Sequence, residues 1–394
     1  MSLNHDNLVV KPPTTANLIR NFDPEVIRAD AESTRIIVHP RFPQLVEQFL
    51  DHKRARGSKY EKALYSRMSD WKEEVSRLVE KRPLTFMNGN DFTVLRNGVM
   101  ITDGTDEWDR NGTAVQDKNE YLTLEEYLSY DEIMLSSLIG VSGYSYLIND
   151  GNRYNKAVPG RPGTFEERAV IVGLVGPRFE RPNRMDSIFI LPCESKGQDP
   201  QLSTLFRSFF GVVRNEVTTF DKEMYMARVR ITVEIFLLEA NDRAKNAHRK
   251  AYGYVVGLGL GVWQHHNDQP TMYIDTFTSV LDSLHLTNIS TLEFSWIEVP
   301  PTCAKNLADS AQRQGIRAIF SKRNPAEKLD TDELLTLSYA WDGNAFPGNE
   351  YWCGYLAMSG DPAAACMSTI PELHNALVNP FTDRVTVLEF EMTT

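Results

Sequence analysis

The sequence predicts an α/β fold, in which a sheet is covered by helices on both faces. From about residue 140 onward, short apolar runs typical of buried strands alternate with stretches whose apolar residues recur at helical spacing. The chain of 394 residues is long enough for a large core, and 42% hydrophobic and 24% charged residues are ordinary for a globular protein. No internal repeat is present, so we do not expect a repeat architecture.

Before residue 120 the pattern is mainly helical. A mixed polar sequence with two adjacent prolines predicts that residues 1–40 are extended or partly disordered. Apolar residues at steps of three and four predict helices over Phe42–Arg56 and Ser58–Lys81. We therefore expect residues 1–120 to form an N-terminal helical extension and residues 121–394 to form the main domain. The other elements predicted in the extension are a strand pair, Leu84–Met87 with Phe92–Ile101, and an exposed loop over residues 102–119.

The main domain is expected to begin with a helix over Thr123–Leu138, because Thr123 can cap it and acidic residues follow in the first turn. Met224–Leu238 has apolar residues that suit a helix, but its many β-branched side chains leave a strand open. Ala240–Ala251 is compatible with a helix. The predicted strands are Ala169–Val175, Ser187–Leu191, Thr291–Trp296, Ile316–Phe320, Leu334–Tyr339 and Arg384–Phe390, and a further helix is predicted over Gln201–Phe210.

One strand ends in glycines spaced two residues apart, at Gly257, Gly259 and Gly261. Glycine allows positive φ and close approach to the main chain, and successive N–H groups can form a concavity that suits phosphate. A predicted helix over Met272–Leu284 follows and can add a favourable dipole. The pattern is neither a Rossmann fingerprint nor a Walker loop. The alternative is a bulge or a close contact between strands.

A second unusual segment follows the predicted strand Leu334–Tyr339. It combines glycines, prolines and aromatic residues with the carboxylates Asp342, Glu350 and Asp361, and Asn344 adds an amide. Such a composition is typical of a folded loop that approaches a polar ligand. The alternative is a surface loop with solvated acids, in which Asp361 simply caps a helix.

Both segments directly follow strands. In α/β sheets, ligands bind outside the carboxyl ends of the strands. We therefore expect the glycines and the acids to lie at one edge of the sheet and to form one site.

Charge and hydropathy limit the classes of partner that we expect this protein to bind. A net charge of −11 is not that of a nucleic-acid-binding protein. No signal peptide and no run of eighteen apolar residues is apparent, so we expect a cytoplasmic protein without a membrane partner. His265-His266 lacks a third ligand at suitable spacing, and we predict neither a metal nor a cofactor.

Three motifs resemble those of macrodomains, which bind ADP-ribose. They are Asn344-Ala345-Phe346-Pro347-Gly348-Asn349-Glu350, Gly257-Leu258-Gly259-Leu260-Gly261-Val262 and Val170-Ile171-Val172-Gly173-Leu174-Val175-Gly176-Pro177. Within that superfamily the chain is similar to the MavL-like group. The similarity rests on residues 257–263, 340–352 and 359–365. It implies a macrodomain-like mixed sheet flanked by helices, with residues 121–394 as the catalytic domain.

The resemblance also implies a function, the removal of mono-ADP-ribose from arginine side chains by cleavage of an N-glycosidic bond. ADP-ribose and an ADP-ribosylated protein would then be the partners. The implied catalytic residues are Asp342, Glu350 and Asp361, and the implied ADP-ribose contacts are Gly257, Gly259, Gly261, Val262, Trp263, Asn344, Gly348, Asn349 and Trp352. For the two tryptophans, core packing remains open.

Two departures from the usual macrodomain matter. The glycine segment precedes the asparagine segment, which is the reverse of the common order, and the adjacent glutamates of poly(ADP-ribose) glycohydrolases are absent. The second departure favours a mono-ADP-ribose substrate. The alternative function is an ADP-ribose-binding macrodomain that reads the modification without cleaving it.

Overall fold

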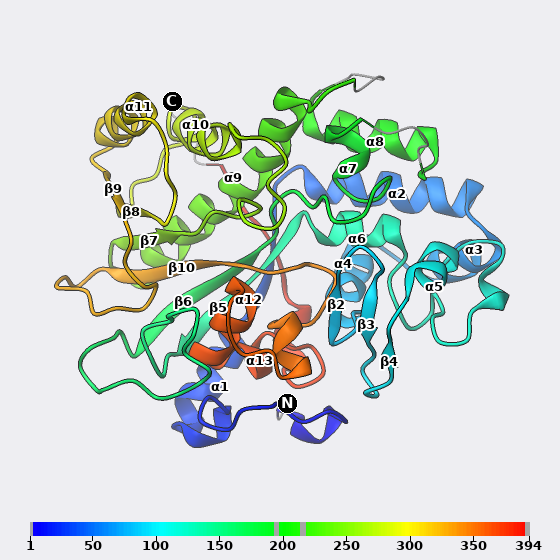
Figure 1. Cartoon of the computed structure of the whole chain (residues 1–394), viewed down its shortest axis with the longest axis horizontal. Coiled ribbons are helices and arrows are strands. Elements are labelled where there is room, and N and C mark those ends of the chain that lie inside the picture. The colour runs from blue at the N-terminus through cyan, green and yellow to red at the C-terminus, as the bar shows by residue number, and fades with distance from the viewer. Residues whose placement is uncertain (1–2, 193–196, 213–217, 391–394) are drawn as a thin grey trace.

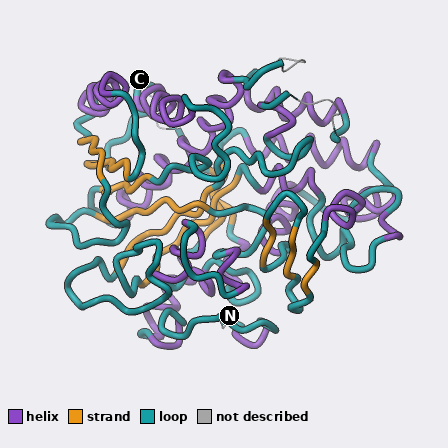
Figure 2. Tube along the Cα trace, viewed as in Figure 1, coloured by secondary structure: helices purple, strands orange, loops and turns teal. Residues whose placement is uncertain are grey.

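The computed structural model describes residues 3–192, 197–212 and 218–390, and a mixed sheet runs through the centre of the molecule (Figures 1 and 2). Within these residues eight strands pair in the order β11-β1-β5-β6-β10-β7-β8-β9. β5 is antiparallel to both of its neighbours, and the other pairs are parallel. The strands are β1 (Arg35–Val38), β5 (Ile139–Tyr146), β6 (Arg168–Leu174), β7 (Ala251–Val255), β8 (Ile289–Ser295), β9 (Arg317–Ser321), β10 (Leu334–Ala340) and β11 (Val385–Val387).

Helices cover both faces of this sheet, as Figure 1 shows. On one face lie α7 (Ser187–Ile190), α8 (Pro200–Phe210), α9 (Lys222–Asn246), α10 (Gln269–Leu281) and α11 (Pro301–Arg313). On the other lie α1 (Pro24–Ser33), α12 (Gly360–Met367) and α13 (Ile370–Leu373). The prediction of an α/β sheet covered on both faces is therefore confirmed.

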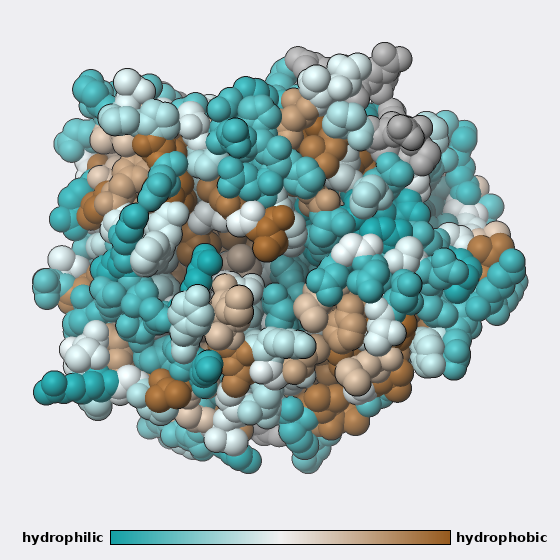
Figure 3. Space-filling view, viewed as in Figure 1, coloured by the Kyte–Doolittle hydropathy of each residue, from teal (hydrophilic) through white to brown (hydrophobic). Residues whose placement is uncertain are grey.

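A smaller unit packs beside the main sheet. Its three-stranded antiparallel sheet has the order β2-β3-β4, and Figure 3 shows hydrophobic residues gathered over this part of the surface. Its elements are β2 (Thr85–Met87), β3 (Phe92–Val94), β4 (Met100–Ile101), α2 (Phe42–Arg56), α3 (Lys59–Tyr65), α4 (Trp71–Glu80), α5 (Thr105–Arg110) and α6 (Tyr130–Ser136). The predicted pairing of Leu84–Met87 with the start of Phe92–Ile101 is confirmed, but the second segment is two antiparallel strands, β3 and β4, and not one.

The beginning of the chain is better ordered than its composition predicts. The expectation of an extended or partly disordered segment is wrong for residues 24–38, which form α1 and β1. Asp23 caps α1 by accepting the N–H groups of Glu25 and Val26, and Pro24 occupies its first turn. β1 then inserts into the main sheet between β11 and β5.

Three other predicted elements are corrected. Ser58–Lys81 is two helices, because Asp70 caps a new helix by accepting the N–H groups of Lys72 and Glu73. The helix expected over Thr123–Leu138 begins only at Tyr130, after a capping box formed by Ser129 and Glu132. The loop expected over residues 102–119 contains α5, whose Trp108 is buried.

The strand predicted over Ser187–Leu191 is also wrong, since these residues form the short helix α7. A run of four or five apolar residues has no period that distinguishes the two states. The ambiguous segment Met224–Leu238 and the following Ala240–Ala251 fall mostly within one helix of 25 residues, α9. Neighbours on nearly all sides bury this helix, so its apolar residues do not mark a single face.

Residues before 120 contribute to the same hydrophobic core as residues after it, since Ile36 and Phe49 belong to one buried cluster with Val172 and Leu337. The division of the chain at residue 120 stays a prediction. No helix within the described residues is long and apolar enough to cross a membrane.

Candidate active site

Three neighbouring parallel strands, β6, β10 and β7, end at one edge of the sheet. The chain leaves β10 through residues 341–361, here called the acidic loop, and leaves β7 through residues 256–263, here called the glycine loop. β10 leads to α12 on one face of the sheet, whereas β7 leads to α10 on the other (Figure 1). In α/β sheets, ligands bind where strands diverge in this way at their carboxyl ends, and both candidate segments lie at this edge.

The glycine loop contacts the segment that follows β6. A Cβ added at Gly176 would lie 2.6 Å from the carbonyl carbon of Leu258, so the two main chains touch. Gly259 has a φ of +74°, and a Cβ there would lie 3.1 Å from the carbonyl oxygen of Pro177. Gly259 therefore serves both of the roles considered above, a turn with positive φ and a close backbone contact.

The same loop presents unused backbone donors. Gly261 and Val262 are exposed, and a Cβ at Gly261 would meet no atom within 4 Å. Within the part of the chain that the structure describes, five N–H groups of this loop donate no hydrogen bond, those of Gly257, Gly259, Gly261, Val262 and Trp263. Such a set of donors can bind an anion.

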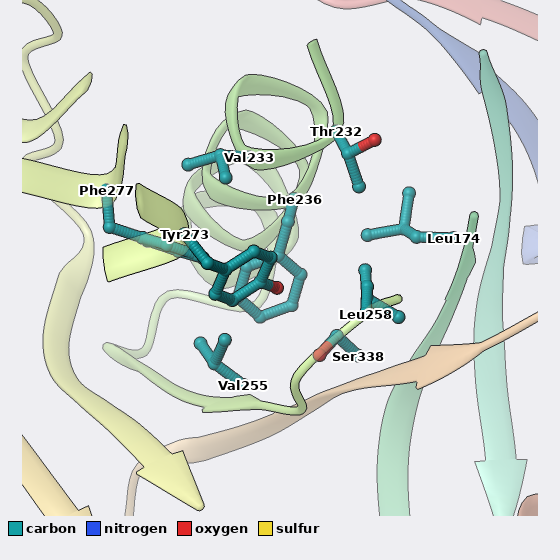
Figure 4. A pocket seen from close by; sticks show the side chains of 9 residues that line it. All are labelled: Leu174, Thr232, Val233, Phe236, Val255, Leu258, Tyr273, Phe277 and Ser338. Atoms are coloured by element: carbon teal, nitrogen blue, oxygen red, sulfur yellow. The ribbon is translucent and has the colours of Figure 1, made fainter. Parts of the chain in front are cut away.

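A small apolar gap lies beneath the glycine loop, between α9, α10 and the sheet (Figure 4). Leu258 points into it from the loop, and Tyr273 fixes the start of the loop by donating its hydroxyl proton to the carbonyl oxygen of Val256 at 2.9 Å. The gap is lined almost entirely by buried hydrophobic side chains, so we assign it to core packing under the loop.

The three predicted acids lie together in the acidic loop. Burial, reinforced by the charge of Glu350, raises the pKa of Asp342 to about 7, although the Arg178 guanidinium opposes this shift. Burial also raises the pKa of Glu350. Asp361 is 2% exposed, and burial together with the charges of Asp342 and Glu350 raises its pKa well above the usual range. The three carboxyl groups therefore influence one another, which solvated surface acids would not do.

Asp361 supports the turn beneath the other acids. Its Oδ1 accepts the N–H of Gly348 at 2.8 Å, and its buried Oδ2 has no partner among the described residues. The helix cap considered above is not formed by Asp361, because Ser359 occupies the N-cap position of α12. Gly348 itself has a φ of +99°, so this turn requires glycine.

Asn349 links the acidic loop to the small sheet. Its Oδ1 accepts the N–H of Phe86 at 2.8 Å, and its Nδ2 donates to the carbonyl oxygen of Phe86 at 3.1 Å and to Asp342 Oδ2. The amide of Asn349 thus orients the Asp342 carboxyl while it pairs with β2. This bonding makes Asn349 a positioning residue for Asp342.

Asn344 is different, because it is 1% exposed and neither atom of its side-chain amide has a hydrogen-bond partner among the described residues. Buried amides without partners are rare and mark a site that awaits polar contacts.

The two tryptophans also differ from each other. Trp352 packs in a hydrophobic cluster and donates its indole N–H to the carbonyl oxygen of Pro347 at 2.9 Å. Trp263 is partly exposed and lies against the Arg178 guanidinium, 4.9 Å from its ring centre.

Sequence reasoning missed two residues that the loop after β6 supplies. The guanidinium of Arg178 donates to the carbonyl oxygen of Asp342 and to the Glu180 carboxylate. Burial alone would lower the pKa of Arg178, but the charges of Glu180 and Asp342 outweigh it and raise that pKa. The nearby Val170–Pro177 motif pointed to this loop, but nothing in the sequence indicated these side chains.

The segment before residue 120 supplies a third missed residue, the buried Arg82. Its guanidinium stacks on Trp341 at 3.9 Å and donates to Ser136 Oγ at 2.8 Å. Burial lowers the pKa of Arg82 to about 9, and the charge of Asp361 opposes this shift. No local sequence pattern could place Arg82 beside residues some 260 positions later in the chain.

We find no group of His, Cys, Asp or Glu side chains among the described residues that could hold a metal ion. His265 is exposed and its ring packs edge-on against Phe179, with 5.1 Å between ring centroids. His266 Nδ1 accepts the N–H of Asp268 at 3.1 Å. Both histidines therefore have the contacts of residues in a surface loop.

Buried carboxyl groups, free backbone donors and a buried arginine thus come together at one edge of the sheet. The family described as "ADP-ribosylhydrolase MavL-like" matches residues 14–201 and 201–388. The chain belongs to this family.

Two curated relatives from Drosophila melanogaster are similar over most of the chain. The protein named "ADP-ribosylarginine hydrolase CG3568" is 35% identical over 398 residues, which cover 90% of this chain and 77% of that protein. The protein named "ADP-ribosylarginine hydrolase CG2909" is 33% identical over 400 residues, which cover 90% of this chain and 78% of that protein.

Proposed function

We propose that this protein removes mono-ADP-ribose from arginine side chains of modified proteins. Family membership and the names of the two Drosophila relatives support an ADP-ribosylhydrolase. The observation that carries the proposal is the cluster of Asp342, Glu350 and Asp361 beside the glycine loop, because their raised pKa values are typical of acid–base chemistry.

The glycine loop is assigned to the diphosphate, in the manner of a macrodomain. Its five unused N–H groups can bind phosphate oxygens without a basic side chain. The overall charge of −11 makes such a local device necessary for an anionic ligand. Asn344, with both amide atoms free, is assigned to the hydroxyl groups of the distal ribose.

In the reaction, water adds to the anomeric carbon while the bond to the guanidine nitrogen breaks. The hydroxyl of water ends on the ribose, its other proton ends on the arginine, and the bonding electrons leave with the nitrogen. We assign the Asp342 carboxylate as the base that takes the proton from water, because a pKa of about 7 suits a base at neutral pH. Glu350 would stabilise the positive charge that develops on the ribose.

Arginine selectivity would come from the negative charge around the leaving group. Glu180 and Glu350 both act on the site electrostatically, and a carboxylate can pair with a guanidinium through two hydrogen bonds. The same charges would disfavour a glutamate-linked substrate, because its leaving group is a negatively charged carboxylate. We assign Asp361, which is buried and bonded to Gly348, to holding the loop rather than to contact with substrate.

The test is the release of ADP-ribose from proteins modified on arginine, serine or glutamate. We expect release from the arginine linkage alone, and at least a hundredfold slower release by Asp342→Asn, which removes the base but keeps the side-chain shape. ADP-ribose titration and a thermal melt confirm that the variant binds ligand and is folded. Binding without release from any linkage would instead identify a reader of the modification.

A further inference from the structure

The loop that joins β5 to β6 lies against the end of the acidic loop and the start of α12 (Figure 1). The N–H of Met358 donates to the carbonyl oxygen of Arg153 at 3.0 Å. The side-chain amide of Asn155 donates to the carbonyl oxygen of Ala363 at 3.1 Å. Two segments that are far apart in the chain therefore form one surface beside the candidate active site.

This surface leaves large side chains open to solvent. Tyr154 is 66% exposed, Tyr355 is 63% exposed and Met358 is 74% exposed. Arg153 and Lys156 are exposed as well, and neither side chain has an ion pair or a hydrogen bond among the described residues. Aromatic residues, methionine and arginine are enriched at protein interfaces. These five residues are here called the outer rim.

The cations of the outer rim stay unpaired although acids lie at both ends of the same loop. Asp150 Oδ2 accepts the side-chain amide of Asn324 at 3.0 Å. Glu166 pairs with Lys328 at 3.1 Å. Because the chain as a whole has a net charge of −11, two free cations on one loop form a local positive patch. Such a patch attracts an acidic partner to this place and repels a basic one.

The backbone beneath the outer rim is held in unusual conformations. Lys156, Ala157 and Met358 have φ values of +50°, +58° and +83°, although none of them is glycine. Asn149 supports the turn, since its Nδ2 donates to the carbonyl oxygen of Val158 at 3.1 Å. Positive φ at residues other than glycine is uncommon, and such strain is concentrated at functional sites.

The outer rim adjoins Glu350, which the proposed function places beside the ribose and the leaving arginine. The N–H of Tyr355 donates to the carbonyl oxygen of Glu350 at 3.1 Å. Burial raises the pKa of Glu350, and a hydrogen bond with Ser359, the residue after Met358, opposes this shift. An arginine side chain is short, so the main chain of the modified protein must pass close to these acids. The residues that flank the modified arginine therefore reach the outer rim.

We infer that the outer rim binds an acidic segment of the modified protein, next to the ADP-ribosylated arginine in its sequence. The inference rests on the proposed function. Arg153 and Lys156 would pair with carboxylates of that segment, and Tyr154 would pack against its side chains. The rim lies on the side of α12, whereas the glycine loop leads to α10 on the other face of the sheet. ADP-ribose with its diphosphate at the glycine loop is therefore not the ligand of the rim.

The test compares three substrates at low and high salt. They are ADP-ribosylarginine itself, a peptide in which glutamates flank one ADP-ribosylarginine, and a matched peptide with lysines in place of the glutamates. We expect kcat/KM of the wild type to be about tenfold higher for the glutamate peptide than for the lysine peptide, and this preference should shrink as salt is added.

The double variant Arg153→Glu, Lys156→Glu should prefer the lysine peptide, while its kcat/KM for ADP-ribosylarginine stays unchanged. Tyr154→Ala should lower kcat/KM several-fold for both peptides and leave that for ADP-ribosylarginine unchanged. Arg56→Glu is the matched control, because Arg56 is exposed, has no ion pair among the described residues and ends α2, far from α12 in Figure 1.

Two results would overturn the inference and leave the proposed function standing. One is equal cleavage of both peptides by the wild type and the double variant, with ADP-ribosylarginine still hydrolysed. The other is a loss of activity in the double variant that is as large for ADP-ribosylarginine as for the glutamate peptide, which would mean that the rim supports the active site itself. A wild-type protein that hydrolyses none of the three substrates would overturn both the inference and the proposed function.

Discussion

Burial and neighbouring charges of opposite sign set the pKa of Asp342. Burial and the carboxylates of Glu350 and Glu180 raise its pKa, while Arg178 and the amide of Asn349 lower it, with a resulting pKa of about 7. This value exceeds the ordinary pKa of an aspartate, so the protonated form persists to neutral pH. If Asp342 is the base, the reaction requires its ionised form.

The activity should therefore rise with pH through an apparent pKa of about 7. Glu180→Gln removes one of the charges that raise this pKa and releases Arg178 to act on Asp342. The midpoint of the acidic limb should move to lower pH by roughly one unit. The measurement is kcat/KM against pH for both proteins, and a midpoint that stays in place would show that the limb belongs to another group.

The same shift has a consequence for stability. Between the ordinary pKa of aspartate and about 7, the folded state binds more protons at Asp342 than the unfolded state does. The contribution of this residue to the free energy of unfolding is thus present at low pH and is lost as the pH rises through 7. Asp342→Asn should abolish this dependence, which chemical denaturation at pH 5 and pH 8 would detect.

Among the elements, the glycine loop offers the sharpest comparison. Gly259 has positive φ and a close contact with Pro177, whereas a Cβ at Gly261 would meet no atom within 4 Å. Gly259→Ala should lower the free energy of unfolding by about 1–2 kcal/mol and weaken ADP-ribose binding, because the loop must shift. Gly261→Ala should leave stability unchanged within about 0.5 kcal/mol. Equal melting temperatures for the two variants would contradict this account of the loop.

Element by element, the sequence predicts most of the central sheet. The runs that became β6, β7, β8, β9 and β10 are apolar and bounded by turn residues, which is the strongest strand signal. The short helix α7 is missed because its three apolar residues have no period, and α9 is ambiguous because burial on nearly all sides erases its polar face.

The residues of the candidate site also differ in whether the sequence predicts them. Asp342 and the glycines are visible because each follows a strong strand signal within a few residues. Arg82 and Glu180 carry no such signal, since their roles depend on contacts with segments far away in the chain.

At the scale of the whole molecule, the segment before residue 120 holds the site together. Asn17 is 1% exposed, and its amide donates to the carbonyl oxygens of Ala365 at 2.8 Å and Ser368 at 3.2 Å. The hydroxyl groups of Thr14 and Tyr351 share a hydrogen bond of 2.7 Å. The first residues of the chain are thus bonded to the loop and the helix that carry Asp361.

These contacts predict that residues 121–394 do not fold alone. Removing residues 1–120 deletes β1 from between β11 and β5 and exposes the buried face of the sheet, so the truncated chain should aggregate or lack a cooperative melt.

A point variant tests the same idea in a chain that folds. Asn17→Ala should cost about 2 kcal/mol, because it leaves buried carbonyl groups without donors, and should also lower kcat/KM. Asn21→Ala is the matched control, since its amide bonds only to nearby exposed backbone. A soluble, cooperatively melting and active 121–394 fragment would instead establish the division at residue 120 and assign the first segment to a separate role.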